Sequence, residues 1–192
     1  MGRGVIKAVI FDCFGVLVEN SFDIFIEKYL DDSKKEEARE ADHLSTQGVL
    51  TWEQNIDVLS RLSGLTHERV NKELDRNPAN RELIDFIRTE LKPHYKIGFL
   101  SNAADDWMED LFSIEEISLF DDVVLSYQHK MNKPSQEIFE LAAARLGVET
   151  HECLFIDDVE RYCEGARSAG MQAIRFVETT SCTGSIKSAL SE

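Results

Sequence analysis

The sequence predicts an α/β fold built on one parallel β-sheet, with a helical subdomain inserted after the first strand. Five short runs rich in Val, Ile and Phe have the length and composition of buried strands. Helix-patterned stretches separate these runs, and strands that alternate with helices form parallel sheets through right-handed crossovers. Between the first two runs lie about eighty residues without a strand-like segment, far more than an ordinary crossover needs.

The strands of the core are expected at residues 5–11, 95–100, 123–126, 153–156 and 172–176. A core helix is predicted over Gln136–Leu146, because its apolar residues recur on one face and Gly147 follows as a C-cap. A second core helix is predicted over 160–169, where Gly170 stops it. A last helix is expected near 181–190.

The inserted segment carries local signals for a small helical bundle. Its helices are expected at residues 22–30, 34–44, 52–62 and 66–74. Thr51 and Gln54 have the spacing of a capping box at the start of the third helix. One more helix over 80–91 leads back to the second strand, and Pro93 marks where it ends.

The composition narrows the possible partners. The chain of 192 residues has a formal net charge of −15 and a pI of about 4.7, whereas nucleic acids and anionic membrane surfaces bind basic footprints. A small ligand or a cation is therefore expected, with no nucleic acid and no membrane. The four cysteines show no CxxC spacing, and no run reaches the roughly 18 apolar residues of a membrane span. These features predict a soluble, reduced, cytoplasmic protein.

Polar side chains stand at the ends of three predicted strands. Asp12 follows the first strand, Ser101 the second, and the pair Asp157 and Asp158 the fourth. Because parallel strands bring their carboxyl ends to one edge of the sheet, these residues should meet there, and we expect Lys133 to join them. Taken singly, each is also typical of a turn, a helix cap or a solvated surface. Their order and common placement favour one shared site.

The carboxylates predict a nucleophile and a metal site. An aspartate at a strand tip, followed by a turn with a glycine, can attack phosphorus and form an acyl phosphate, so Asp12 is the predicted nucleophile. Its carboxylate, the backbone carbonyl of Phe14 and the carboxylate of Asp158 are oxygen ligands of the kind that Mg²⁺ prefers. Asp157 is expected beside these ligands, supporting them from behind. Like charges this close together favour a bound cation.

Three further groups are expected to hold the phosphoryl oxygens. The hydroxyl of Ser101 and the backbone amide of Asn102 lie at a strand-to-helix turn, where such groups bind phosphate. Lys133 supplies the positive charge that offsets the negative charge as the carboxylate meets the phosphoryl group. Removing Lys133 should therefore reduce the chemistry more than the folding.

This ordered set of motifs resembles the haloacid dehalogenase-like (HAD-like) hydrolase superfamily along essentially the whole chain. The resemblance implies a Rossmann-like three-layer sandwich with a five-stranded parallel sheet, a core of residues 1–18 and 93–192, and a helical cap of residues 19–92. It also implies Mg²⁺-dependent hydrolysis of phosphate esters. The stretches 157–166 and 169–171 look most like the small capped phosphatases that hydrolyse sugar phosphates such as glucose 1-phosphate. The expected partner is a small phosphorylated metabolite.

One position departs from the pattern of that superfamily. Most of its phosphatases carry a second aspartate two residues after the nucleophile, which protonates the leaving oxygen and then activates water, whereas this chain has Phe14 there. Losing general acid–base help of this kind lowers a rate by about 10²–10⁴. Weak activity is therefore expected, unless Glu19, seven residues after Asp12, swings over the site as a substitute acid and base.

Two other functions stay open at this point. In 2-haloacid dehalogenases an aromatic residue commonly occupies the position of Phe14, and Arg39 or Arg61 of the cap could hold a carboxylate. The retained pair Asp157 and Asp158 argues against that branch, which needs no Mg²⁺. Alternatively, the protein binds a phosphorylated ligand or a partner without turnover. Buried unpaired charge is costly, so a nucleophile, a lysine and an acidic pair together favour catalysis.

Overall fold

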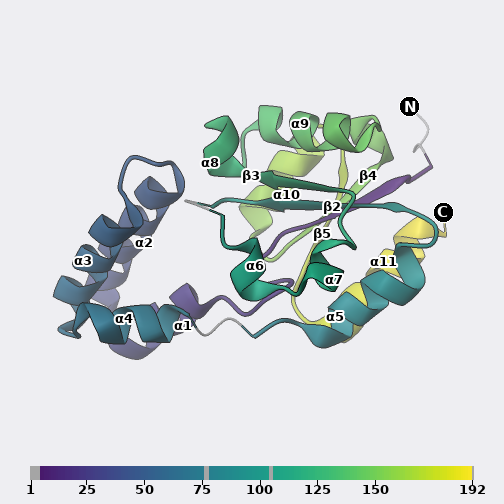
Figure 1. Cartoon of the computed structure of the whole chain (residues 1–192). Helices are drawn as coiled ribbons and strands as arrows, with labels where there is room; N and C mark the ends of the chain where they lie inside the picture. Colours follow the sequence, from purple (N-terminus) through teal and green to yellow (C-terminus); the bar gives the residue numbers. More distant parts are fainter. Residues whose placement is uncertain (1–4, 76–77, 104–105, 192) are drawn as a thin grey trace.

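A computed structural model describes residues 5–75, 78–103 and 106–191 and places a five-stranded, all-parallel sheet at the centre of the core (Figure 1). The strand order is β3-β2-β1-β4-β5. The strands are β1 (Ala8–Phe11), β2 (Lys96–Ser101), β3 (Asp122–Leu125), β4 (Cys153–Asp157) and β5 (Gln172–Arg175). In the central strand, Phe11 stands opposite Phe99 of β2 and Ile156 of β4. The predicted α/β, Rossmann-like sheet and all five of its strands are confirmed.

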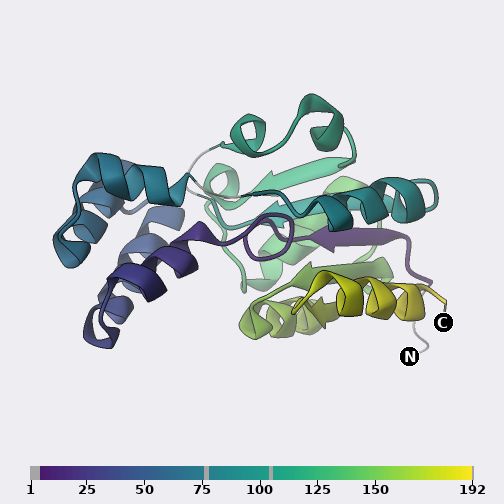
Figure 2. The same cartoon turned by 90° about the horizontal axis from the view of Figure 1, so that it is seen from below.

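Helices cover both faces of the sheet because successive strand residues point to opposite sides. Val9 and Phe11 pack against one helical layer, and Ala8 and Ile10 pack against the other. The first layer contains α5 (Arg81–Phe86), the π-helical turn η1 (Ile87–Leu91) and α11 (Thr179–Leu190), and the second contains α9 (Gln136–Leu146) and α10 (Glu160–Ser168). Figure 2 shows α5 and α11 on the near side of the sheet. Gly147 ends α9 in the left-handed conformation, as predicted.

The predicted cap helices form a bundle beside the carboxyl ends of the strands (Figure 1). They are α1 (Ser21–Tyr29), α2 (Asp32–Thr46), α3 (Trp52–Ser63) and α4 (His67–Leu74). Their buried side chains, such as Phe25, Leu59 and Val70, form a hydrophobic cluster of their own. The predicted capping box of Thr51 and Gln54 is confirmed, with both of its hydrogen bonds present.

The last helical segment before β2 packs with the sheet and not with the cap. Leu83 of α5 and Leu91 of η1 share a cluster with Val9 and Phe99. These apolar side chains pack against the sheet, because α5 and η1 run along one of its faces. The division of the chain at residues 18 and 93 stays a prediction, and this packing favours a cap that ends before α5.

Several short helices of the structure are not among those predicted from the sequence. They are α6 (Met108–Leu111), α7 (Ile114–Ile117), α8 (Ser126–His129) and the 3₁₀ turn η2 (Thr150–Glu152). Segments of three or four residues are too short to show a hydrophobic period, so tertiary contacts decide their conformation. None of the helices in the described part of the chain is both long and apolar enough to cross a membrane.

Candidate active site

Asp12 stands directly after β1, on a loop whose shape depends on a glycine. The backbone N–H of Asp12 donates to the carbonyl of Ile156 at 2.9 Å, which continues the sheet pairing and fixes the position of the carboxylate. Gly15 has φ +83°, and a Cβ built there would lie 2.6 Å from the carboxyl carbon of Asp158. Only glycine therefore fits this turn, which brings the chain after β1 close to the chain after β4.

Lys133 is the buried centre of the charges in the site. Its Nζ lies 2.7 Å from Asp12 Oδ1 and 2.7 Å from Asp157 Oδ2, and its side chain is 1% exposed. Burial alone would lower the pKa of Lys133, but the two carboxylates outweigh this effect and raise the pKa above its ordinary value. Lys133 therefore stays positively charged and balances part of the negative charge around it.

Asp157 and Asp158 occupy different environments although they are neighbours. Asp157 Oδ1 accepts a hydrogen bond from the backbone N–H of Val159 at 2.8 Å, so both of its oxygens have partners within the protein. Burial raises the pKa of Asp157, against the opposing charge of Lys133. Asp158 Oδ1 is buried without a hydrogen-bond partner among the described residues. Burial, and secondarily the charge of Asp12, raises the pKa of Asp158 to about 6.

These carboxylates fit a divalent cation. One oxygen from each of Asp12, Asp157 and Asp158 lies within 4.8 Å of the other two. The buried Asp158 Oδ1 has no hydrogen-bond partner among the described residues, so the protein itself leaves this carboxylate incompletely compensated. Hard oxygen ligands with this spacing suit Mg²⁺. Asp157 already uses both oxygens on Lys133 and Val159, and its supporting role beside the cation stays a prediction.

Ser101 and Asn102 lie where the sequence places them, at the end of β2. Ser101 is 1% exposed and lines the cavity that also contains Asp12. The side chain of Asn102 has a role that the sequence did not indicate. It accepts from the backbone N–H of Lys133 at 2.9 Å and donates to the Lys133 carbonyl at 3.2 Å. These two bonds hold the loop that presents Lys133 to the carboxylates.

The position of Phe14 is apolar and close to an aromatic partner. Its ring meets the ring of Trp107 edge to face at a centroid distance of 4.8 Å, and both residues line the cavity. Glu19 is exposed, its backbone N–H donates to the carbonyl of Pro78 at 3.2 Å, and it is not among the described residues that line the cavity. The structure therefore brings Phe14 to Asp12 but does not bring Glu19 there.

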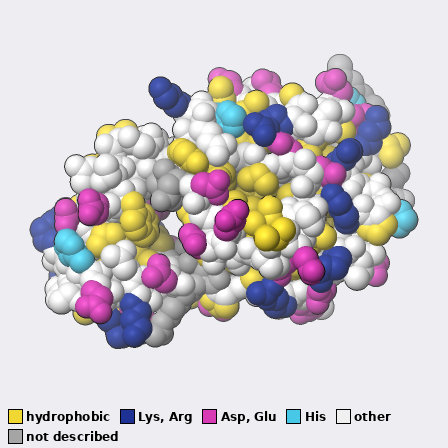
Figure 3. Space-filling view, in the orientation of Figure 1, with side chains coloured by type: hydrophobic (Ala, Val, Ile, Leu, Met, Phe, Trp, Pro, Cys, Tyr) yellow, Lys and Arg dark blue, Asp and Glu magenta, His cyan; other side chains and the backbone are white. Residues whose placement is uncertain are grey.

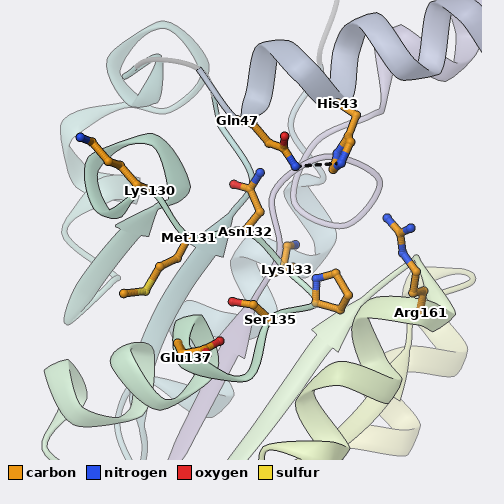
Figure 4. Close-up of a pocket in the computed structure, with 10 residues that line it drawn as sticks. His43, Gln47, Lys130, Met131, Asn132, Lys133, Ser135, Glu137 and Arg161 are labelled. Carbon is orange, nitrogen blue, oxygen red and sulfur yellow. Dashed lines mark hydrogen bonds between the residues drawn. The ribbon is translucent and has the colours of Figure 1, made fainter. Parts of the chain in front are cut away.

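The cavity above Asp12 has a volume of about 960 Å³ and lies between the core and the cap. In Figure 3 acidic side chains gather where the cap meets the core. A smaller cavity of about 580 Å³ (Figure 4) shares His43, Lys133 and Arg161 with the lining of the larger one. There His43 of α2 is hydrogen-bonded at 2.9 Å to Gln47, the residue that follows this helix, and Arg161 of α10 points toward them from the core.

The two cap arginines that were considered for holding a carboxylate, Arg39 and Arg61, differ in position. Arg39 lines the larger cavity, where its guanidinium lies 3.6 Å from Asp23, while Arg61 is outside the lining and pairs with Glu37 at 2.6 Å. Neither is therefore a free cation for a substrate carboxylate.

Tyr162 is a residue of the site that the sequence did not indicate. The centroid of its ring lies 4.9 Å from Lys133 Nζ. No local spacing indicates this contact, because the two residues meet only through the fold.

Comparison with known proteins identifies the family. Residues 6–170 match the haloacid dehalogenase-like hydrolase family model. A phosphorylated carbohydrates phosphatase of Thermotoga maritima is 28% identical over 184 residues, which cover 88% of this chain and 83% of that protein. The match of the family model spans most of the chain, including every motif residue from Asp12 to Asp158.

Two solved structures share the fold. A HAD family enzyme from Bacteroides thetaiotaomicron, in complex with magnesium and inorganic phosphate, is 24% identical with a TM-score of 0.68, covering 88% of this chain and 93% of its own. The L-2-haloacid dehalogenase from Xanthobacter autotrophicus is 20% identical with a TM-score of 0.68, covering 95% and 83%. At these identities the likeness shows the fold alone. With the family match over residues 6–170, the chain belongs to the haloacid dehalogenase-like hydrolases.

Proposed function

We propose that this protein is a Mg²⁺-dependent phosphatase that hydrolyses a small phosphorylated metabolite, a sugar phosphate, through an aspartyl phosphate on Asp12. The observation that carries the proposal is the pairing of Asp12 with the buried Lys133, beside the unpartnered carboxylate of Asp158. The similarity to a phosphorylated carbohydrates phosphatase supports the substrate class.

Asp12 is the nucleophile of the proposed reaction. One of its carboxylate oxygens attacks phosphorus, and the bond between phosphorus and the leaving oxygen breaks with its electron pair on that oxygen. Lys133, Ser101 and the backbone amide of Asn102 bind the phosphoryl oxygens and offset the charge that develops on them. Water then attacks the phosphorus of the aspartyl phosphate, which releases inorganic phosphate and restores the carboxylate.

Asp12, Asp158 and the backbone carbonyl of Phe14 would hold Mg²⁺, with Asp157 supporting them through its bonds to Lys133 and Val159. When bound, the cation neutralises the carboxylates and polarises a phosphoryl oxygen. The observation that Asp158 Oδ1 is buried without a partner supports its assignment as a ligand.

Phe14 removes the expected proton donor to the leaving oxygen. A phenyl ring packed on Trp107 can neither protonate an alkoxide nor activate water. The reaction should therefore be slowest for substrates with poor leaving groups. For these substrates the rate should be about 10²–10⁴ lower than in an enzyme that has an acid at this position. Glu19 as a substitute stays a prediction, and its position outside the cavity lining does not support it.

A second candidate function is binding without turnover. The apolar contact of Phe14 with Trp107 inside the cavity favours it, since the same contact would suit a protein that only holds a phosphorylated ligand or partner. Dehalogenation is less well supported, because the carboxylates of Asp157 and Asp158 fit a cation that such a reaction does not need.

The test is phosphate release from p-nitrophenyl phosphate and a panel of sugar phosphates, with and without Mg²⁺. Release that requires both Mg²⁺ and Asp12, as judged by the Asp12→Asn variant, is the expected result. Absence of release from every ester, in a folded sample that binds Mg²⁺, would refute the phosphatase and favour the binding function. A haloacid assay under the same conditions separates the dehalogenase.

A further inference from the structure

The cap side of the larger cavity carries groups that the reaction at Asp12 does not use. Asp42 and Ser45 project from α2, and Trp52 begins α3; all three line the cavity opposite the catalytic loops. We propose that these three residues recognise the hydroxyl groups and the ring of a neutral, polyhydroxylated leaving group. The proposal rests on the proposed function, and it specifies the chemical nature of the leaving group.

Asp42 has a carboxylate that can accept hydrogen bonds from a ligand. It is half-buried, and its Oδ1 lies 3.4 Å from the amide nitrogen of Asn55, a residue of α3 that is 0% exposed. One weak hydrogen bond leaves most of the acceptor capacity of the carboxylate unused. Burial, with a smaller contribution from the nearby Asp23, raises the pKa of Asp42 to about 6, against the bond from Asn55. A carboxylate with spare lone pairs accepts hydrogen bonds from hydroxyl groups.

Ser45 provides an independent observation. Its side chain is 1% exposed, lines the cavity, and its Oγ has no hydrogen-bond partner among the described residues. A buried polar atom without a partner is uncommon in folded proteins and needs a ligand or water to satisfy it. Ser45 follows Asp42 by three residues, so the two side chains lie on the same face of α2 and can contact one ligand.

The charges of this wall favour a neutral ligand. Asp23, Glu36, Glu40 and Asp42 line the cavity from the cap, and Arg39, which lies among them, is 3.6 Å from Asp23. A second phosphate or a carboxylate on the leaving group would be repelled by these acids. Trp52 is 43% exposed and adds an apolar face, against which the C–H groups of a sugar ring can pack. Acceptors, a hydroxyl and an aromatic face together suit a sugar.

The experiment compares a hydroxylated phosphate with one that has no hydroxyl groups. Phenyl phosphate is the reporter substrate, and glucose 1-phosphate, glucose 6-phosphate and inorganic phosphate are tested as competitors of its hydrolysis. In the wild-type protein at least one glucose phosphate should compete about tenfold better than inorganic phosphate, which corresponds to about 1.4 kcal/mol of added binding. Asp42→Asn and Ser45→Ala should each weaken that competition about five- to tenfold, while phenyl phosphate turnover changes less than about twofold.

Glu37→Gln is the matched control. Glu37 also lies on α2, but it is exposed, pairs with Arg61 and is outside the lining of the cavity. This variant should leave all inhibition constants unchanged. Trp52→Ala should weaken the glucose phosphates more than it weakens inorganic phosphate.

Two results would overturn the inference while phosphatase activity stands. In the first, the glucose phosphates compete no better than inorganic phosphate. In the second, Asp42→Asn changes glucose phosphates and phenyl phosphate to the same extent, which would indicate a general structural effect. If the wild-type protein hydrolyses neither phenyl phosphate nor p-nitrophenyl phosphate, whose leaving group needs no protonation, the proposed function fails instead. In that case, calorimetric titration of the same glucose phosphates into the wild-type protein and Asp42→Asn decides the inference. The dissociation constant should be about five- to tenfold larger for the variant, and equal constants would overturn the inference.

Discussion

At the scale of single residues, Lys133 provides the positive charge that balances the carboxylates of Asp12 and Asp157. It contacts two carboxylates at 2.7 Å while 1% exposed, so neither carboxylate is screened by bulk water. A buried charge that loses its partner is far more costly than an exposed one. The same geometry therefore links stability and chemistry, which separates Lys133 from the surface lysines of the chain.

Replacing Lys133 by methionine should lower the free energy of unfolding by about 3–5 kcal/mol, because Asp12 and Asp157 lose their buried partner. Phosphate release should fall below detection. Lys187→Met is the control: Lys187 pairs with Glu90 at 3.3 Å on the surface, and such a pair contributes only about 0–1 kcal/mol. Urea denaturation of the three proteins measures the difference. Equal stability of both variants would show that the buried pairing does not stabilise the fold.

Phe14→Asp should restore the missing proton donor. For a sugar phosphate with a poor leaving group we expect kcat to rise by about 10²–10⁴, and for p-nitrophenyl phosphate, which needs no protonation, much less. Phe14→Asn has the same size without the acid and should give no such rise. Steady-state kinetics of the three proteins on both substrates test this. A similar change in Asn and Asp variants would show that removal of the ring, and not proton transfer, is responsible.

At the scale of structural elements, the turns after the strands are as decisive as the side chains that they carry. The loop after β1 depends on Gly15, whose positive φ lets the chain pass beside Asp158 without a Cβ in the way. The isolated pairing of Phe14 with Val18 closes this loop. In the cap, α2 carries Asp42, a half-buried acid whose charge affects the stability of the protein.

Gly15→Ala should both destabilise the protein and weaken Mg²⁺ binding, because the new Cβ meets the Asp158 carboxylate. Gly48→Ala is the control, since Gly48 also has positive φ, +70°, but a Cβ there meets no atom within 4 Å. Backbone strain alone costs about 1–2 kcal/mol, and only Gly15→Ala should exceed that and lose affinity. Thermal unfolding and Mg²⁺ titration calorimetry measure the two effects. Equal behaviour of the two variants would contradict the close approach to Asp158.

Asp42 should make the cap sensitive to pH. Its pKa in the folded protein is about 6, above the ordinary 3.8, so the stability associated with its protonated form is present below pH 3.8 and is lost as pH rises through about 6. Asp42→Asn should therefore be more stable than the wild type at pH 8, by about 1–3 kcal/mol, with the difference shrinking toward pH 4. Thermal melts at both pH values test this. A constant difference would show that the charge of Asp42 is not destabilising.

At the scale of the whole molecule, the cap and the core meet around a cavity that neither could form alone. The two connections between them lie side by side, with Val18 paired to Ala79. On the far rim, the hydroxyl of Ser126 lies 3.4 Å from the carbonyl of Thr46 at the end of α2. The net charge of −15 adds general repulsion within the compact state, which a bound cation should relieve.

Mg²⁺ should stabilise the whole chain through the carboxylates of the site. At a concentration ten times the dissociation constant, binding to the folded state alone contributes about 1.4 kcal/mol. Differential scanning fluorimetry with MgCl₂, compared with NaCl of equal ionic strength, should show a rise in Tm for the wild type and a much smaller one for Asp158→Asn. An equal rise in both proteins would show that Mg²⁺ acts on the general acidic surface.

The sequence by itself determined the five strands and placed Asp12, Ser101, Asp157 and Asp158 at or directly after strand ends. These features are local: strand composition, the position of turns, and the rule that parallel strands bring their carboxyl ends to one edge. It also predicted that Lys133 would meet them, which the pairing to Asp12 and Asp157 confirms.

Only the tertiary structure decided which residues complete the site. The packing of α5 with the sheet, the clamp of Asn102 on the Lys133 loop, and the cavity wall of Asp42 and Ser45 all join residues far apart along the chain. Glu19 is close to Asp12 in sequence, yet it lies outside the cavity. Local patterns report which face of a helix or strand is apolar, whereas the partner of a buried polar group depends on how whole elements pack together.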